Sequence, residues 1–142
     1  MKNQLFALIG LGLLLATASA YAQTGVVKAN VPFNFIVDKT QIPAGEYVIQ
    51  NLGTAGLAMS IQSSDRKMVK VVLPNACESS QAQPKTKLVF HRYGDQYFLH
   101  QIRFSRDREY TFPASVAERE MIRAAVDTHG PGQVLVTVAA AR

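Results

Sequence analysis

Apolar and polar residues alternate along the stretch from Val27 to Val37. Side chains of a β-strand point to opposite faces with a period of two, so this pattern predicts a long strand with one buried face. Pro32 has no backbone N–H, and we therefore expect the strand to lie at a sheet edge or to bend there. The residues expected on the buried face are Val27, Ala29, Val31, Phe33, Phe35 and Val37.

Turn-forming residues separate further alternating segments. Pro43-Ala44-Gly45 predicts a tight turn. Ser63-Ser64-Asp65 predicts a three-residue hairpin loop that pairs Met59 with Val69. The alternating segments expected to form strands are residues 46–50, 57–62, 68–73, 110–113 and 133–139.

The clearest hairpin joins residues 87–93 to residues 96–102. Gly94-Asp95 lies between the two segments and suits a two-residue turn with glycine at its first central position. The predicted pairs are Tyr93–Gln96, Arg92–Tyr97, His91–Phe98, Phe90–Leu99 and Val89–His100.

A single helix is expected near the end of the chain. Ser115 and Glu118 match the S-x-x-E capping box, which predicts a helix over about residues 115–126. The residues expected on its packing face are Ala117, Met121 and Ala124 or Ala125.

Together these segments predict a mainly β fold. Short turns connect the strands, so we expect an antiparallel β-sandwich or partly closed barrel of about 7–8 strands, with the helix over an end or one face. Neither a repeat nor a linker is visible in the sequence, which predicts one β-rich domain over residues 23–142.

The first 22 residues have the pattern of a secretory signal peptide. Lys2 supplies a positive start, residues 5–16 are apolar, and small residues follow. We expect cleavage between Ala22 and Gln23, which places the mature protein in the periplasm or outside the cell. The apolar run is short for a transmembrane helix, which needs roughly 20 residues.

Composition excludes several classes of protein. The chain has 142 residues, a net charge of +5 and one cysteine, so an intrachain disulfide scaffold is excluded. Acidic residues interleave with the densest arginine cluster, and export argues against a nucleic-acid partner.

Cys77 lies in the polar stretch 75–84, which predicts a loop.

Familiar catalytic motifs are absent from the sequence, including G-x-S-x-G, H-E-x-x-H, the P-loop and C-x-x-C. We therefore expect a protein that is not an enzyme and has no cofactor. His91 and His100 are diagonal neighbours in the predicted hairpin, which leaves a metal-binding or hydrolytic protein as an alternative. Glu118 and Glu120 point away from each other on a helix, which disfavours a paired-carboxylate site.

Several motifs carry a resemblance to a known group of proteins. V-P-F-x-F-x-V (residues 31–37), I-P-A-G-E-Y (42–47) and Y-G-D-x-Y-F-L (93–99) resemble a set of small secreted proteins abundant in acidobacteria. The resemblance covers most of the chain after the leader. It implies export and a compact β-rich fold, and it brings no assigned activity or catalytic residues.

The leading hypothesis is an exported β-domain that acts by surface binding or as a structural envelope component. Its expected partner is a protein or polysaccharide of the cell envelope, and Tyr93, Tyr97 and Phe98 are the expected contact patch. An alternative is self-assembly into a homo-oligomer, in which the N-terminal strand, residues 26–37, adds to a neighbouring subunit.

Overall fold

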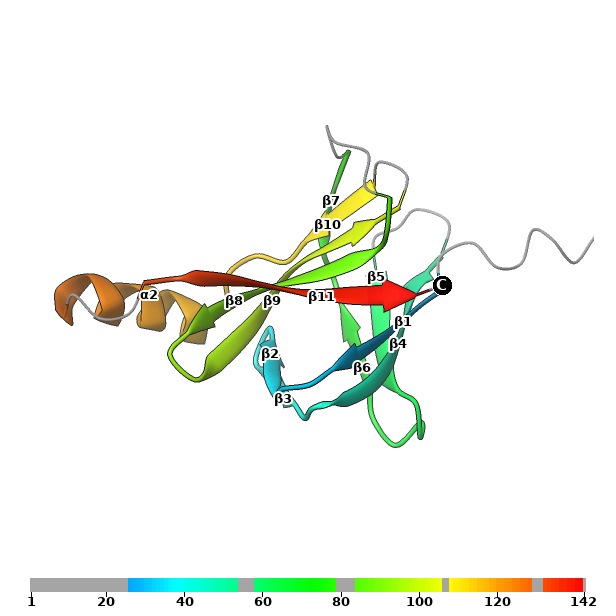
Figure 1. Ribbon diagram of the computed structural model, residues 1–142, viewed down its shortest axis with the longest axis horizontal. Helices are drawn as coiled ribbons and strands as arrows, with labels where there is room; N and C mark the ends of the chain where they lie inside the picture. The colour runs from blue at the N-terminus through cyan, green and yellow to red at the C-terminus, as the bar shows by residue number, and fades with distance from the viewer. Residues whose placement is uncertain (1–25, 54–57, 79–83, 106–107, 129–131, 142) are drawn as a thin grey trace, which may run out of the picture.

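The computed structural model describes residues 26–53, 58–78, 84–105, 108–128 and 132–141, and within them it shows eleven strands and one helix (Figure 1). The predicted cleavage site, Ala22 and Gln23, lies outside the described residues. The strands are β1 (Val26–Val31), β2 (Phe35–Val37), β3 (Thr40–Ile42), β4 (Gly45–Leu52), β5 (Ala58–Ser63), β6 (Val69–Val72), β7 (Asn75–Glu78), β8 (Lys87–Tyr93), β9 (Gln96–Phe104), β10 (Arg108–Thr111) and β11 (Val134–Ala141), and the helix is α2 (Val116–Thr128).

The strands form one curled sheet, which confirms the mainly β, partly closed fold (Figure 1). Its order is β3-β2-β9-β8-β11-β1-β4-β5-β6, and β10 joins β7 to the second half of β9. The strand pairs are antiparallel except for β2 with β9, where Ile36 lies opposite Phe98 in a parallel pair. The structure has more strands than the predicted 7–8 because the first strand is split and β3 and β7 are additional.

The first predicted strand bends at Pro32 instead of lying at an edge. β1 ends at Val31, and β2 begins at Phe35 in a different part of the sheet. β1 lies between β4, which pairs along its whole length, and β11, which pairs with Lys28 and Ala29. Self-assembly by addition of this strand stays a prediction. The predicted alternation of buried residues holds through the bend, where Phe33 is partly buried.

The β5–β6 hairpin has a different register from the predicted one. Met59 pairs with Val72 instead of Val69. The hairpin closes where the Ser63 N–H donates to the Met68 carbonyl oxygen at 3.0 Å. The Ser63 hydroxyl also accepts a hydrogen bond from the Met68 N–H at 3.0 Å, so the loop satisfies its own polar groups and holds a longer connection than we predicted.

This difference in register exposes apolar side chains on the outer face of the sheet. A slip by an odd number of residues exchanges the faces of a strand. Val72 is therefore buried, whereas Val69, Val71 and Leu73 are 57%, 53% and 73% exposed. Within the described residues β6 pairs only with β5, so these side chains lie along a free edge of the sheet.

The β8–β9 hairpin follows the predicted register from its turn as far as the pair Phe90–Leu99. Beyond this pair a β-bulge shifts the register, and Val89 pairs with Gln101 instead of His100. His100 is the extra residue of the bulge. Its carbonyl oxygen accepts a hydrogen bond from the Phe112 N–H at 2.8 Å, which connects the bulge to the segment after β10.

The predicted loop over residues 75–84 is partly a strand. Asn75–Glu78 forms β7, in which Cys77 pairs with Glu109 of β10. The expectation that Cys77 lies in a loop is therefore wrong. The sequence pattern gave no sign of this strand because its residues are mostly polar or small, and its pairing with β10 depends on tertiary structure.

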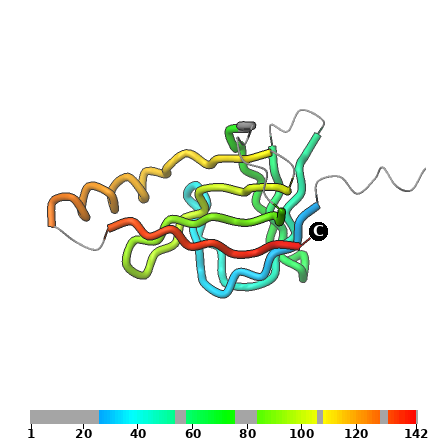
Figure 2. Tube along the Cα trace, turned by 45° about the horizontal axis from the view of Figure 1, so that its top comes forward, coloured from blue at the N-terminus to red at the C-terminus, as the bar shows by residue number. Residues whose placement is uncertain are grey.

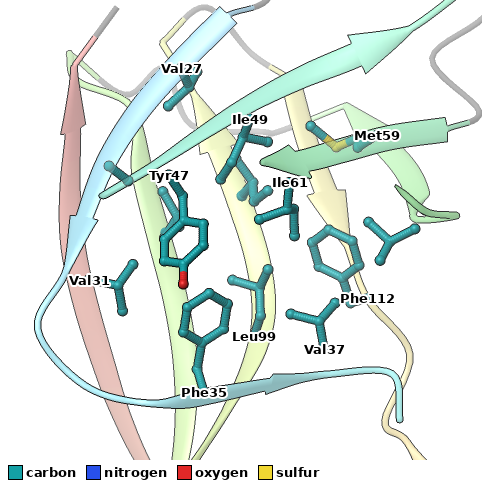
Figure 3. Packing of buried hydrophobic residues seen from close by; sticks show 14 of the residues in the cluster. Val27, Val31, Phe35, Val37, Tyr47, Ile49, Met59, Ile61, Leu99 and Phe112 are labelled. Carbon is teal, nitrogen blue, oxygen red and sulfur yellow. The ribbon is translucent and has the colours of Figure 1, made fainter. Parts of the chain in front are cut away.

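The concave face of the sheet encloses the apolar core (Figure 3). Phe35 is central: its ring lies 5.6 Å from the ring of Tyr47 and 5.4 Å from that of Phe90, both in edge-to-face geometry. Burial of each large side chain contributes about 1.5–3 kcal/mol. The most enclosed members are Phe35, Phe90, Ile42, Ile49, Met59, Ile61, Leu88, Ile102, Val27, Val31 and Val37.

Helix α2 lies at one end of the molecule, near the tip of the β8–β9 hairpin and the start of β11 (Figures 1 and 2). Glu118 is its only buried residue. Met121 and Ala125 are partly buried, whereas Ala117 and Ala124 are exposed, so the predicted packing face was partly wrong. The helix is attached through a carboxylate in its first turn, and its later turns extend beyond the core.

Candidate functional site

The first turn of α2 brings Glu118 against the outer face of the β8–β9 hairpin. The Glu118 N–H donates to the Ser115 hydroxyl at 3.1 Å, as in a capping box. In a complete box the carboxylate would turn back toward the Ser115 backbone. Here it points to the sheet instead, with Oε1 2.8 Å from Nδ1 of His91 and 3.3 Å from the hydroxyl of Tyr93.

The bulge in β9 places His100 beside His91. Their rings are stacked, with centroids 3.8 Å apart and an interplanar angle of 22°. Together with Tyr93 and Glu118 they form a group of four titratable side chains, which we call the outer cluster. It draws on two strands and the helix, and the predicted proximity of the two histidines is confirmed.

The surroundings of the outer cluster favour neutral forms of two of its members. Burial, and secondarily the charge of His91, lower the pKa of His100. Burial, with a further contribution from Glu118, raises the pKa of Tyr93 to about 12. Tyr93 therefore keeps its proton, and its hydroxyl donates a hydrogen bond to Glu118. The same carboxylate also accepts a hydrogen bond from Nδ1–H of His91.

A glutamate that orients a histidine is also one part of a catalytic triad, so the outer cluster invites comparison with one. A triad needs a nucleophile hydrogen-bonded to the imidazole, and the described residues supply none. The side chains of His91 and Glu118 are only 12% and 5% exposed. Glu118, His91 and Tyr93 thus use polar groups on each other, and a substrate has little access to His91 and Glu118.

The same geometry bears on the metal-binding alternative. Nearly parallel imidazoles cannot both direct a lone pair, in the ring plane, at one ion between them. Among the described residues, no group of three His, Cys, Asp or Glu side chains is placed to hold a metal ion. His129 lies outside those residues. The geometry therefore favours a structural role for the pair His91 and His100.

Glu118 is the member that sequence analysis missed. The sequence predicts Glu118 as part of a helix cap and disfavours it as one half of a carboxylate pair with Glu120, and neither role places it beside the histidines. Its spacing from Met121 and Ala125 was the available signal, because these three positions share one helical face. A charged residue on a packing face indicates a polar partner on the element beneath.

Two of the three residues of the predicted contact patch are buried. Tyr93 and Phe98 are only 3% and 2% exposed, so the expectation of an exposed aromatic patch is wrong for both. The bulged hairpin and the packed helix cover them on the outer face. Tyr97 is half-buried on the opposite face, where its ring stacks on that of Phe33 at 3.9 Å.

Tyr97 belongs to a row of side chains that crosses three strands at the end of the core. In this row Val134 of β11 lies opposite Arg92, and Arg92 lies opposite Tyr97. Directly opposed residues share a face of a sheet, so all three side chains are on the core-facing side. We call this row, with Phe33 stacked on it, the terminal row.

The chain has no match among known protein families, curated proteins or solved structures. Among its described residues, no helix combines the length and the apolar character needed to cross a membrane. Functional inference therefore depends on the outer cluster, the terminal row and the exposed surface.

Proposed function

We propose that this chain is an exported, non-enzymatic β-domain that binds a component of the cell envelope through its surface. The periplasm or the cell exterior is its proposed location. The leader-like first 22 residues support export. The proposal agrees with the resemblance to secreted acidobacterial proteins.

One observation carries the non-enzymatic part of the proposal. The outer cluster brings four titratable groups of the described residues together, and its carboxylate accepts hydrogen bonds from His91 and Tyr93. An active site keeps such groups accessible to a substrate atom. The hydrogen bonds of this cluster instead attach helix α2 to strand β8. We therefore propose that the protein acts by binding a partner through its surface.

The exposed apolar side chains near α2 support a role in binding. Val126 of the helix is 71% exposed, and Val134 and Leu135 at the start of β11 are 44% and 63% exposed. Large exposed apolar side chains are candidates for contact with a partner, although Val134 and Leu135 point to opposite faces of β11. Without Lys2 of the leader, the chain has 14 Lys and Arg residues against 10 Asp and Glu, and this net charge of +4 further favours the anionic polymers of an envelope.

Cosedimentation of the chain from residue 23 onward with isolated envelope fractions tests this function. We expect the protein to pellet with the envelope, and to pellet equally after His91→Ala. Failure to pellet at any salt concentration would contradict surface binding. Turnover of an envelope polymer that disappears in His91→Ala would show an enzyme instead. Amino-terminal sequencing of the exported protein should begin at Gln23.

A second candidate function is self-association through β6. This strand has a free edge within the described residues. It carries the exposed Val69 and Val71, and the exposed Leu73 follows it directly. An open apolar edge is a template for a strand of a second copy. Light scattering should then show a dimer that Val71→Lys converts to a monomer, whereas a monomer at high concentration would exclude this candidate.

A further inference from the structure

The terminal row ends the core-facing side of the β8–β9–β11 part of the sheet. One rung deeper, Phe90 is fully enclosed and Leu99 is only 4% exposed. At the terminal row itself, Arg92 and Tyr97 are half-buried and Val134 is 44% exposed. The row is therefore the place where the core meets solvent at the open end of the half-barrel.

Arg92 has an unusual environment for a cation. Its Nε is buried and has no hydrogen-bond partner, and the described residues place no carboxylate in an ion pair with it. A buried donor left without an acceptor costs about 1–3 kcal/mol, which native proteins rarely accept without a reason. Arg92 as a whole is only half-buried, and an anion bound to its guanidinium would supply the missing negative charge.

The ring pair of Tyr97 and Phe33 lies beside this cation. The rings are stacked at an interplanar angle of 14°, and both are half-buried. Aromatic rings offer flat apolar faces, and the C–H groups on one side of a pyranose ring pack well on such faces. The tyrosine hydroxyl adds a donor for a sugar oxygen.

We propose that the terminal row binds a carboxylate-bearing saccharide, such as a uronate unit of an envelope polysaccharide. The carboxylate pairs with the Arg92 guanidinium, for which a planar two-oxygen anion is the best geometric match. The sugar ring lies against the ring pair, on the face of Tyr97 that Phe33 leaves free. This inference rests on the proposed function and names the chemistry of the envelope component.

Calorimetric titration with a galacturonate oligomer tests the inference, with a neutral galactose oligomer of equal length as the matched ligand. We expect the acidic oligomer to bind and the neutral one to bind much more weakly. Arg92→Gln should reduce the affinity about ten- to hundredfold, the range for a charge-assisted hydrogen bond. Arg123→Gln, which removes an exposed charge from α2, is the control and should leave the affinity within about twofold.

Each contrary outcome has a distinct meaning. Equal binding of both oligomers, or equal affinity of Arg92→Gln and the native chain, overturns the uronate site. If the protein still pellets with envelope fractions, the proposed function survives that result. Absence of both kinds of binding contradicts the two proposals together. Sulfate that competes as strongly as the oligomer would show a simple anion site and no saccharide site.

Tyr97→Leu provides a second route if Arg92→Gln does not fold. It keeps an apolar side chain in the row and leaves Arg92 intact, so we expect weaker binding of the oligomer with an unchanged response to sulfate. Unchanged affinity for the oligomer in Tyr97→Leu would overturn the stacking part of the proposal. Thermal unfolding of each variant identifies those that are folded.

Discussion

Glu118 connects the helix to the sheet through a side chain that is normally costly to bury. Its carboxylate is buried, yet it accepts hydrogen bonds from His91 and Tyr93, and its own N–H is capped by Ser115. Its place in the first turn also puts a negative group at the positive end of the helix dipole. These interactions offset the cost of removing the carboxylate from water.

Glu118→Ala should lower the free energy of unfolding by about 1–3 kcal/mol, because it leaves the partner groups on His91 and Tyr93 unpaired. Glu120→Ala makes the same chemical change on the exposed side of the helix and should stay within about 0.5 kcal/mol. Chemical denaturation of the two variants measures the difference. Equal stability of the two would show that the outer cluster does not hold the helix.

The raised pKa of Tyr93, about 12 against an ordinary value of 10.0, predicts a dependence of stability on alkaline pH. The folded state keeps the phenol proton to a higher pH than the unfolded chain does. The stabilising contribution is therefore complete below pH 10 and is lost as the pH rises toward 12.

Ultraviolet titration of the native chain and of Tyr93→Phe measures this effect. The difference between the two curves should give one phenol that ionises near the upper end of that range. A difference curve centred on pH 10 would place Tyr93 in water and contradict the buried contact with Glu118.

At the level of elements, turn and capping motifs in the sequence predicted the hairpin and the helix that they begin. Gly94-Asp95 and the alternation beside it predicted the β8–β9 register as far as Phe90, and the capping box predicted the start of α2. The sequence did not predict the bulge at His100, whose carbonyl oxygen accepts a hydrogen bond from the Phe112 N–H. Such a contact between distant segments leaves no pattern in either one.

For the β5–β6 hairpin, the register predicted from the sequence was wrong. Apolar alternation alone favoured Val69 as a partner of Met59, since both are apolar. The loop decides the register instead, through the bonds that Ser63 makes with Met68 and with the side chain of Asp65. The assumption that alternating apolar residues are buried fails for β6, because this strand exposes Val69 and Val71.

The attachment of α2 predicts local unfolding. Ser115→Ala removes the acceptor for the Glu118 N–H and should destabilise the helix by about 1 kcal/mol. Because the later turns of α2 extend beyond the core, hydrogen exchange should accelerate in residues 116–128 with little change in β1 or β4. Uniform acceleration over the whole chain would show that the helix unfolds only together with the sheet.

At the level of the whole molecule, the fold class was predictable because one face of each main strand enters a common core. The strand order was not predictable: β2 reaches β9 and β11 enters between β8 and β1, and these pairings join distant parts of the chain. The outer cluster and terminal row depend on those pairings. Their residues were visible in the sequence, but their neighbours were not.

Shortening a side chain should affect stability very differently in the core and at the exposed edge of the sheet. Phe90→Ala should cost about 3–5 kcal/mol, because Phe90 is fully enclosed and its loss leaves a cavity. Leu73→Ala should cost well under about 1 kcal/mol, since that side chain is 73% exposed. Denaturant midpoints measure both, and a large cost at Leu73 would indicate that β6 is covered in solution.

Mapping by nuclear magnetic resonance during titration with the galacturonate oligomer tests the central claim most directly, since it locates binding on the folded chain. We predict that the signals of the Arg92 Nε–H, Tyr97 and Phe33 move and that those of His91, His100 and Glu118 stay in place. Shifts concentrated on the two histidines, with the Arg92 signal unchanged, would contradict the assignment of the outer cluster to structure and of the terminal row to binding.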